Sequence, residues 1–214
     1  MDIGILGAGS WGAALSVLLS TNNHNVTLWS SSIKKSKSIK KFNYLNNIKI
    51  PKNTYLTSNI NNILDKNIIL IALPSHIIKS VLTNIKVNKD TIIVNCSKGF
   101  DLESEQRLSV VISEELKIGM ENIIFLSGPS HAEEVIKKTP TAVIAAGVSE
   151  KNTKLIQGIL SNNYFRVYQS NDLIGAEIGA SCKNVISIAS GICVGLGYGD
   201  NTIAALISRG LQEI

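Results

Sequence analysis

The segment Ile3-Gly4-Ile5-Leu6-Gly7-Ala8-Gly9-Ser10-Trp11-Gly12 decides the fold of this chain. A short apolar strand leads into a turn with GxGxxG spacing, and a helix of small and apolar residues follows at 13–20. In dinucleotide-binding folds the first glycine permits the turn, the second lets a pyrophosphate approach, and the third lets helix and strand pack closely. The helix N-terminus then binds the pyrophosphate. We therefore predict a dinucleotide site with Gly7, Gly9 and Gly12, and we prefer it to a glycine turn without a ligand.

Strand and helix patterns alternate beyond this turn, which predicts an α/β fold with a Rossmann-type, doubly wound and mainly parallel sheet. The strand candidates are 3–6, 26–29, 55–57, 68–73, 91–95, 123–126, 142–145 and 165–168. The helix candidates are 13–20, 76–83, 103–116, 132–138 and 152–160. A polar stretch from Ser30 to about Lys52 is expected to contain little beyond one helix.

The pattern changes near residue 170. From Asp172 onward the sequence has no strand alternation, only a long helical pattern rich in Gly, Ala and Ser. We predict a dinucleotide-binding domain at 1–170 and the start of an all-helical domain at 171–214. This helical part is too short for a core of its own, and it ends without a helix stop signal. We therefore expect a fragment, or a subunit completed elsewhere.

The end of the second strand bears on the choice of cofactor. NAD-selective sites usually carry Asp or Glu about 20 residues after the glycine turn, but the residues here are Trp29-Ser30-Ser31-Ser32. A carboxylate would repel a 2′-phosphate, whereas serine hydroxyls and Lys34 or Lys35 would accept one. NADP is therefore favoured, with NAD as the alternative, because the basic cluster can also be a solvated face.

The composition excludes several classes of protein. The net charge is +5, and no acidic residue occurs between Ile3 and Leu64, but the lysine-rich tract lacks the interleaved aromatic residues of a nucleic-acid site. No leader precedes the first strand, and the apolar run Val185–Leu196 is little more than half of the about 20 residues that a membrane span needs. We expect a cytoplasmic protein with no nucleic-acid partner, no membrane span and no metal. Its cysteines and histidines lack metal-ligand spacing; they are Cys96, Cys182, Cys193, His24, His76 and His131.

Two lysines occur at positions that suggest a function for them: one at a sheet edge and one in an apolar helix. Lys98 follows the end of a predicted strand, at the sheet edge where α/β proteins bind ligands. Lys183 is the only basic residue in a long apolar helix, where burial would lower its pKa and let it accept a proton. Oxidation of a secondary alcohol requires such a proton acceptor as hydride leaves for a nicotinamide. The alternatives are a surface lysine in a loop for Lys98 and a lysine extending from a helix face for Lys183.

Five sequence blocks in this order resemble the NAD(P)-dependent glycerol-3-phosphate dehydrogenase family, and the bacterial type most. The blocks are Gly7-Ala8-Gly9-Ser10-Trp11-Gly12, Ser97-Lys98-Gly99, Ser127-Gly128-Pro129-Ser130, Lys183-Asn184-Val185-Ile186 and Gly195-Leu196-Gly197-Tyr198-Gly199-Asp200-Asn201-Thr202. The resemblance implies reversible reduction of dihydroxyacetone phosphate to sn-glycerol 3-phosphate, which feeds glycerophospholipid synthesis. It covers essentially the whole chain.

The resemblance also implies roles for residues in these blocks. Ser10 and Trp11 would contact the cofactor pyrophosphate, Ser31 the adenosine ribose, and Ala132 the nicotinamide. The implied substrate contacts are Lys98, Gly128, Ser130 and Lys183, with Lys98 also bordering the cofactor. Lys183 would be the proton acceptor, and Asn184 would orient the substrate.

The family pattern continues past Ile214 with a helical segment carrying an Asp and an Arg-Asn pair near the substrate phosphate, and this sequence lacks it. Arg209 is the one arginine in the helical part, and a structural role suits it equally well. Two alternatives remain: a related dehydrogenase of the 3-hydroxyacid, 6-phosphogluconate or ketopantoate type, and an NADP-binding fragment without activity. A homodimer is among the expected states.

Overall fold

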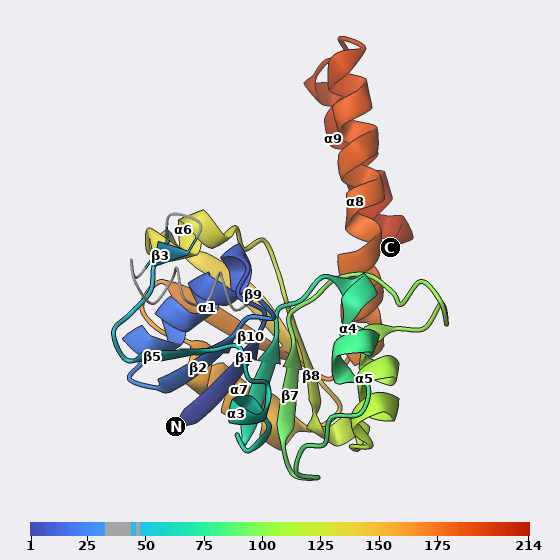
Figure 1. Ribbon diagram of the computed structural model, residues 1–214. Coiled ribbons are helices and arrows are strands. Elements are labelled where there is room, and N and C mark those ends of the chain that lie inside the picture. The colour runs from blue at the N-terminus through green and yellow to red at the C-terminus, as the bar shows by residue number, and fades with distance from the viewer. Residues whose placement is uncertain (33–43, 46–47) are drawn as a thin grey trace.

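The computed structural model describes residues 1–32, 44–45 and 48–214, and its centre is one eight-stranded sheet (Figure 1). The strand order is β10-β9-β8-β7-β6-β1-β2-β5. Among the described residues, every neighbouring pair in this sheet is parallel except β8–β9. The strands are β1 (Asp2–Leu6), β2 (Asn25–Trp29), β5 (Thr54–Thr57), β6 (Ile68–Ile71), β7 (Ile92–Asn95), β8 (Ile123–Ser127), β9 (Thr141–Ala146) and β10 (Phe165–Ser170). The predicted Rossmann-type sheet is confirmed.

Helices cover both faces of the sheet and divide its core in two. The central strands are apolar on both faces, because a parallel sheet with helices on each side has no solvent-facing surface. One core lies under α1 (Ser10–Thr21), α6 (Ala132–Ile136) and α7 (Glu150–Leu160). The other lies under α3 (Asn61–Leu64), α4 (Ser75–Leu82), α5 (Leu108–Leu116) and the short 3-10 helix η1 (Met120–Asn122).

Strand β1 lies between β2 and β6, at the point where the strand order reverses. Leu6, the last residue of β1, pairs with Trp29 on one side and with Ile71 on the other. Beyond it, the Gly7 N–H donates to the Trp29 carbonyl at 3.2 Å, and the Ala72 N–H donates to the Leu6 carbonyl at 2.8 Å. Ligands of open α/β sheets bind at the carboxyl ends of the strands at such a reversal. The glycine turn, residues 7–12, occupies this position.

Two antiparallel helices follow the sheet, α8 (Leu173–Gly195) and α9 (Asp200–Glu213), and they project beyond it (Figure 1). The sequence predicted one long helical run, but the chain reverses between them, where Gly197 has a φ of +79°. Ile186 on α8 then packs at Gly210 on α9. The start of α8 is capped by the Asp172 carboxylate, which accepts from the Gly175 N–H at 2.8 Å.

Some predicted boundaries are wrong. The helix expected at 103–116 begins only at Leu108, because the Asp101 carboxylate accepts from the Ser104 N–H and hydroxyl and holds a turn instead. The strand expected at 68–73 ends at Ile71, and the helix expected at 132–138 ends at Ile136. The helix expected after Ser30 falls mostly on 33–43, outside the described residues; beyond it, β3 (Tyr44–Leu45) and β4 (Ile48–Lys49) form a short antiparallel ladder.

Helix α8 is the one helix in the described part of the chain that is long and apolar enough to cross a membrane by length and composition. The predicted absence of a span rested on Val185–Leu196, which is only part of this 23-residue helix. The first half of α8 packs on β8 and β9. It also buries Glu177, which forms an ion pair with Arg107. These contacts attach the first half of α8 to the sheet domain.

Candidate functional site

The glycine turn is shaped so that only its second glycine faces open space. Gly7 has a φ of +115°, and a Cβ there would lie 2.3 Å from the Ala72 carbonyl oxygen. A Cβ on Gly12 would lie 1.9 Å from the Gly7 carbonyl oxygen, whereas a Cβ on Gly9 would meet nothing within 4 Å. Helix α1 begins at Ser10, and no side chain caps it. The turn therefore has the tight packing, the open approach and the helix N-terminus that a pyrophosphate site needs.

A cavity of about 320 Å³ opens beside this turn, and we name it cavity A. It lies at the carboxyl edge of the sheet, between the start of α1, the segment after β7 and the segment after β8. Its lining residues are Ser10, Trp11, Cys96, Lys98, Leu126, Ser127, Ser130, His131, Ala132 and Glu133. Five predicted site residues thus share one cavity: Ser10, Trp11, Lys98, Ser130 and Ala132.

A second cavity of about 330 Å³, cavity B, adjoins cavity A at Ser127. It lies between the turn after β8 and one face of α8. Its lining residues are Ser127, Gly128, Pro129, Ile144, Ala176, Gly179, Ala180 and Lys183. Two further predicted residues, Gly128 and Lys183, therefore both line cavity B. It lies on the other side of the 127–130 turn from cavity A.

The two lysines connect the cavities. The Lys98 ammonium donates to the Gly128 carbonyl at 3.5 Å. Partial desolvation, together with charge repulsion from the neighbouring Lys183 and a side-chain contact with it, lowers the pKa of Lys98 to about 8. Two lysines that share a site in this way release a first proton more readily than two separate lysines. Lys98 can therefore bind an anion as an ammonium and release its proton near pH 8.

The expectation that Lys183 is buried is wrong, because α8 exposes it. Lys98, at the strand end, is exposed as well, but partial desolvation and the charge of Lys183 lower its pKa. Asn184 is exposed next to Lys183 and lines neither cavity. Ser31 is exposed just after β2, outside both cavities, although its strand end is bonded to the glycine turn through the Trp29 carbonyl. Lys34 and Lys35, which were expected to favour NADP, lie outside the described residues.

Sequence reasoning missed a buried polar cluster that attaches α8 to the sheet domain. Its members are Arg107, Ser109 and Glu177, and the Glu177 side chain is only 3% exposed. A signal was present in the sequence: Glu177 is the only acidic residue of α8, just as Lys183 is its only basic one. The same reasoning that singled out the lysine applies to the carboxylate.

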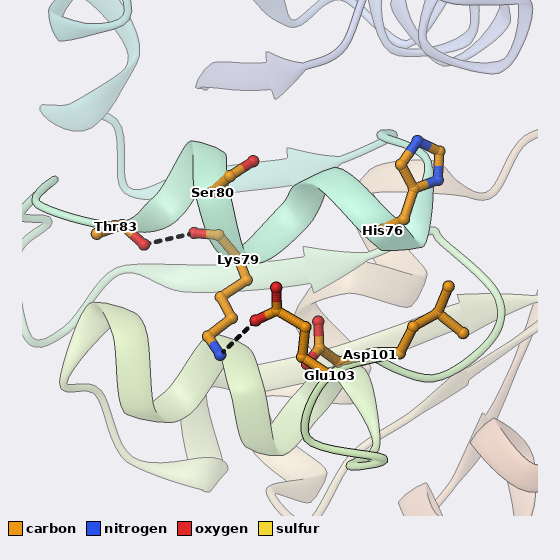
Figure 2. Close-up of a pocket in the computed structure, with 7 residues that line it drawn as sticks. His76, Lys79, Ser80, Thr83, Asp101 and Glu103 are labelled. Carbon is orange, nitrogen blue, oxygen red and sulfur yellow. Dashed lines mark hydrogen bonds and ion pairs between the residues drawn. The ribbon is translucent and has the colours of Figure 1, made fainter.

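A groove at α4, which contains four titratable side chains, lies apart from both cavities. Figure 2 shows the exposed Lys79–Glu103 ion pair at 3.3 Å, with His76 pointing away from it. His76, which follows β6 at the start of α4, lines neither cavity A nor cavity B. Because its charged groups pair with each other and no glycine-turn residue lines the groove, we do not place the site there.

The cysteines give no metal site. Among residues 1–32, 44–45 and 48–214, no group of three His, Cys, Asp or Glu side chains could hold a metal ion. Cys96, Cys182 and Cys193 are all free thiols. Burial raises the pKa of Cys96, which lines cavity A, so it stays protonated there and acts as a small apolar side chain.

The strand reversal, the glycine turn and cavity A define a protein of the Rossmann class. Two family models extend this: residues 2–154 match the N-terminus of NAD-dependent glycerol-3-phosphate dehydrogenase, and residues 172–214 match its C-terminus. The chain therefore belongs to the NAD-dependent glycerol-3-phosphate dehydrogenase family.

Relatives and solved structures agree with this assignment. The chain is 43% identical to the glycerol-3-phosphate dehydrogenase [NAD(P)+] of Fusobacterium nucleatum, and 43% identical to that of Carboxydothermus hydrogenoformans. It spans its full length in both comparisons, but 66% of the length of each relative. The crystal structure of glycerol-3-phosphate dehydrogenase from Coxiella burnetii superposes with a TM-score of 0.86 at 34% identity, covering 99% of this chain and 66% of that one. The Plasmodium falciparum glycerol-3-phosphate dehydrogenase gives 0.91 at 25% identity, covering 100% and 64%.

Proposed function

We propose that this chain catalyses the reversible NAD(P)-dependent interconversion of dihydroxyacetone phosphate and sn-glycerol 3-phosphate in the cytoplasm, and that this step feeds glycerophospholipid synthesis. The observation that carries the proposal is the pair of lysines, Lys98 and Lys183, at the junction of a dinucleotide-type cavity and a second cavity. Family membership supports it. In this scheme residues 1–170 form the dinucleotide domain, and residues 171–214 contribute to the substrate domain, with a homodimer as the expected assembly.

The cofactor would bind at the glycine turn and in cavity A. Gly7, Gly9 and Gly12 shape the turn, and Ser10 and Trp11 at the start of α1 face the pyrophosphate. Ala132 lines the nicotinamide side, and Ser31 follows β2 at the adenosine side. With serine in place of an acidic residue there, we expect NADP to be preferred over NAD. When bound, the nicotinamide supplies the hydride donor or acceptor.

The substrate would occupy cavity B and its border with cavity A. Lys98, Gly128 and Ser130 hold the phosphorylated three-carbon chain, and the lysine ammonium attracts the phosphate dianion. Lys183 accepts the proton of the C2 hydroxyl during oxidation and returns it during reduction. The family resemblance assigns substrate orientation to Asn184, which is exposed beside Lys183 on α8 and lines neither cavity.

Loss of reduced-cofactor absorbance with dihydroxyacetone phosphate tests this proposal, with NADPH and NADH in parallel. We expect turnover that is faster with NADPH, and that falls by about 10²-fold or more in Lys183→Ala while NADPH binding is retained. Lys154→Ala, which removes an exposed lysine of α7, is the matched control and should leave turnover unchanged. Turnover with ketopantoate but not with dihydroxyacetone phosphate, or NADPH binding without any turnover, would contradict the proposal.

A further inference from the structure

We propose that Glu177 is a positioning residue, which fixes α8 against the start of α5 so that Lys183 lies beside Lys98. This inference rests on the proposed function, because that function gives Lys183 its role. The way in which Glu177 holds α8 does not depend on the substrate. We call Arg107, Ser109 and Glu177 together the Glu177 anchor.

Both carboxylate oxygens of Glu177 are bonded. One oxygen accepts from the Ser109 N–H at 2.9 Å. The other accepts from the Ser109 hydroxyl at 2.6 Å and from the Arg107 guanidinium at 2.8 Å. The guanidinium also donates to the Ser109 hydroxyl at 3.1 Å, which closes the network. Every bond to the carboxylate is charge-assisted, and such bonds are about twice as strong as neutral ones.

The anchor also completes helix α5. This helix starts at Leu108, and none of its own residues caps it through a side chain. The Glu177 carboxylate comes from a different helix and binds the first-turn N–H of Ser109. A negative charge is favourable there because the helix N-terminus carries a partial positive charge. The sequence thus uses one side chain of α8 to complete an element of the sheet domain.

A buried ion pair is weak evidence for stability, because desolvation of both charges offsets much of their attraction. An apolar residue at 177 would suit the apolar surroundings of α8 as well, but apolar contacts are non-directional and allow a helix to slide or rotate. The bonds of Glu177 have one geometry, since the network is satisfied in a single register. The anchor therefore fixes where α8 lies.

A second contact transmits this register to the lysines. The Gly99 N–H donates to the Ser181 hydroxyl at 3.1 Å, and that hydroxyl donates to the Glu177 carbonyl at 2.7 Å, one helical turn away. Gly99 directly follows Lys98, and Ser181 lies two residues before Lys183. Gly99 has a φ of +108°, a conformation that glycine adopts without strain. The hydrogen bonds of Glu177 and Ser181 thus hold α8 on both the α5 side and the Gly99 side, next to Lys98 and Lys183.

Titration of Lys98 tests the anchor without requiring turnover. Reductive methylation with isotope-labelled formaldehyde makes each lysine visible by NMR, and the Lys98 signal is identified by its loss in Lys98→Arg. Lys183 lowers the pKa of Lys98 in the intact chain. We expect Glu177→Gln, which keeps the side-chain shape, to release α8 and raise the Lys98 pKa by about 0.5 unit or more. Ser181→Ala should raise it by a smaller amount.

The direction of this shift separates positioning from a plain charge effect. Removing a negative charge near an ammonium lowers its pKa, whereas moving Lys183 away raises it. A Lys98 pKa that is unchanged or lowered in folded Glu177→Gln, and unchanged in Ser181→Ala, overturns the proposal. Glu103→Gln is the matched control: it removes the exposed Lys79–Glu103 pair from the same 99–107 segment, and should leave the titration unchanged.

Turnover gives an independent measurement. If the anchor positions Lys183, Glu177→Gln lowers kcat for dihydroxyacetone phosphate by about 10-fold or more, because small displacements of a proton-transfer group are costly. The KM for NADPH stays at its wild-type value, since no anchor residue lines cavity A. A kcat unchanged in Glu177→Gln counts against positioning. Absence of turnover in the wild-type chain contradicts the proposed function alone, and the Lys98 titration then still decides the inference.

Discussion

At the scale of single residues, neither lysine is buried as an apolar helix would suggest for Lys183. Both Lys98 and Lys183 are exposed, and it is Lys98, in a short polar loop, whose pKa is lowered by partial desolvation and by the charge of Lys183. An apolar helix predicts burial only if another element covers the face that carries the lysine. In the described structure α9 packs along α8 at Ile186 and Gly210, and Lys183 remains accessible. The sequence identifies both residues but not which of them is desolvated.

The glycines of the turn give a prediction at this scale. Gly12→Ala places a methyl group 1.9 Å from the Gly7 carbonyl oxygen, so we expect a loss of about 2 kcal/mol or more in the free energy of unfolding. Gly9→Ala meets nothing within 4 Å, so it should cost under about 1 kcal/mol. The methyl group of Gly9→Ala would fill the space that a pyrophosphate needs, so the affinity of this variant for NADPH should fall about 10-fold or more.

Urea unfolding and NADPH fluorescence titration measure the two effects separately. A Gly9→Ala variant that binds NADPH as tightly as the wild type would show that the open side of the turn is not the binding side. A Gly12→Ala variant of unchanged stability would show that the close packing of α1 on the turn can relax.

At the scale of elements, the types of most helices and strands follow from the sequence, while several ends do not. Periodicity identifies the helix that becomes α5 but not where it begins. Its first turn depends on Glu177, which is distant in sequence and whose carboxylate accepts from the Ser109 N–H. The break between α8 and α9 was missed because both sides read as helix. Gly195, Gly197 and Gly199 belong to a block of the family resemblance, but closely spaced glycines such as these also indicate a chain reversal.

Two helical glycines should respond oppositely to the same substitution. Gly158 lies inside α7, and a Cβ there would meet nothing within 4 Å, so Gly158→Ala should raise the free energy of unfolding by about 0.5–1 kcal/mol. Gly210 lies inside α9, where a Cβ would come within 2.5 Å of Ile186 on α8. Gly210→Ala should therefore lower stability by about 1–3 kcal/mol. Thermal or urea unfolding of both variants tests the α8–α9 contact, and a stabilised Gly210→Ala would contradict it.

At the scale of the whole molecule, the sequence predicts the sheet class from local patterns, and it predicts five of the ten residues that line cavity A, four of them only through the family resemblance. The GxGxxG turn, its strand and its helix are contiguous, so their geometry follows from their spacing. The Glu177 anchor joins Arg107 with Glu177, 70 residues apart, and cavity B joins segments about 50 residues apart, Ser127 with Ala176 for example. Such contacts depend on how α8 crosses the sheet, which no local pattern encodes. The placement of Lys183 next to Lys98 belongs to this second group.

The stability of the molecule should depend on the titration of Lys98. Its folded pKa is about 8, against 10.5 for an unperturbed lysine. Between these values the unfolded chain binds more protons than the folded one, so this lysine makes stability rise with pH over that window. Below about pH 8 both states hold the proton, and the folded state bears the repulsion from Lys183. Lys98→Met should therefore flatten the rise in the free energy of unfolding between about pH 8 and pH 10.

Urea unfolding at several pH values measures this slope, and only the difference from the wild type is assigned to Lys98. Lys154→Met, which removes an exposed lysine on α7, is the control and should keep the wild-type slope. An unchanged slope in Lys98→Met would mean that this lysine titrates alike in the folded and unfolded chains.

The reversed direction of β9 and β10 determines where Lys183 lies relative to the sheet. Because β9 runs opposite to β8, and β10 runs with β9, the chain leaves the sheet near the edge where the other strands begin. Helix α8 must then travel back along the sheet before it passes the carboxyl edge (Figure 1). Ten residues separate Leu173 from Lys183, a rise of about 15 Å, close to the length of a five-residue strand. The length of this helical segment therefore sets the position of Lys183 along the sheet. Inserting or deleting residues between the cap at Asp172 and Lys183 would move the lysine above or below the carboxyl edge, where Lys98 lies.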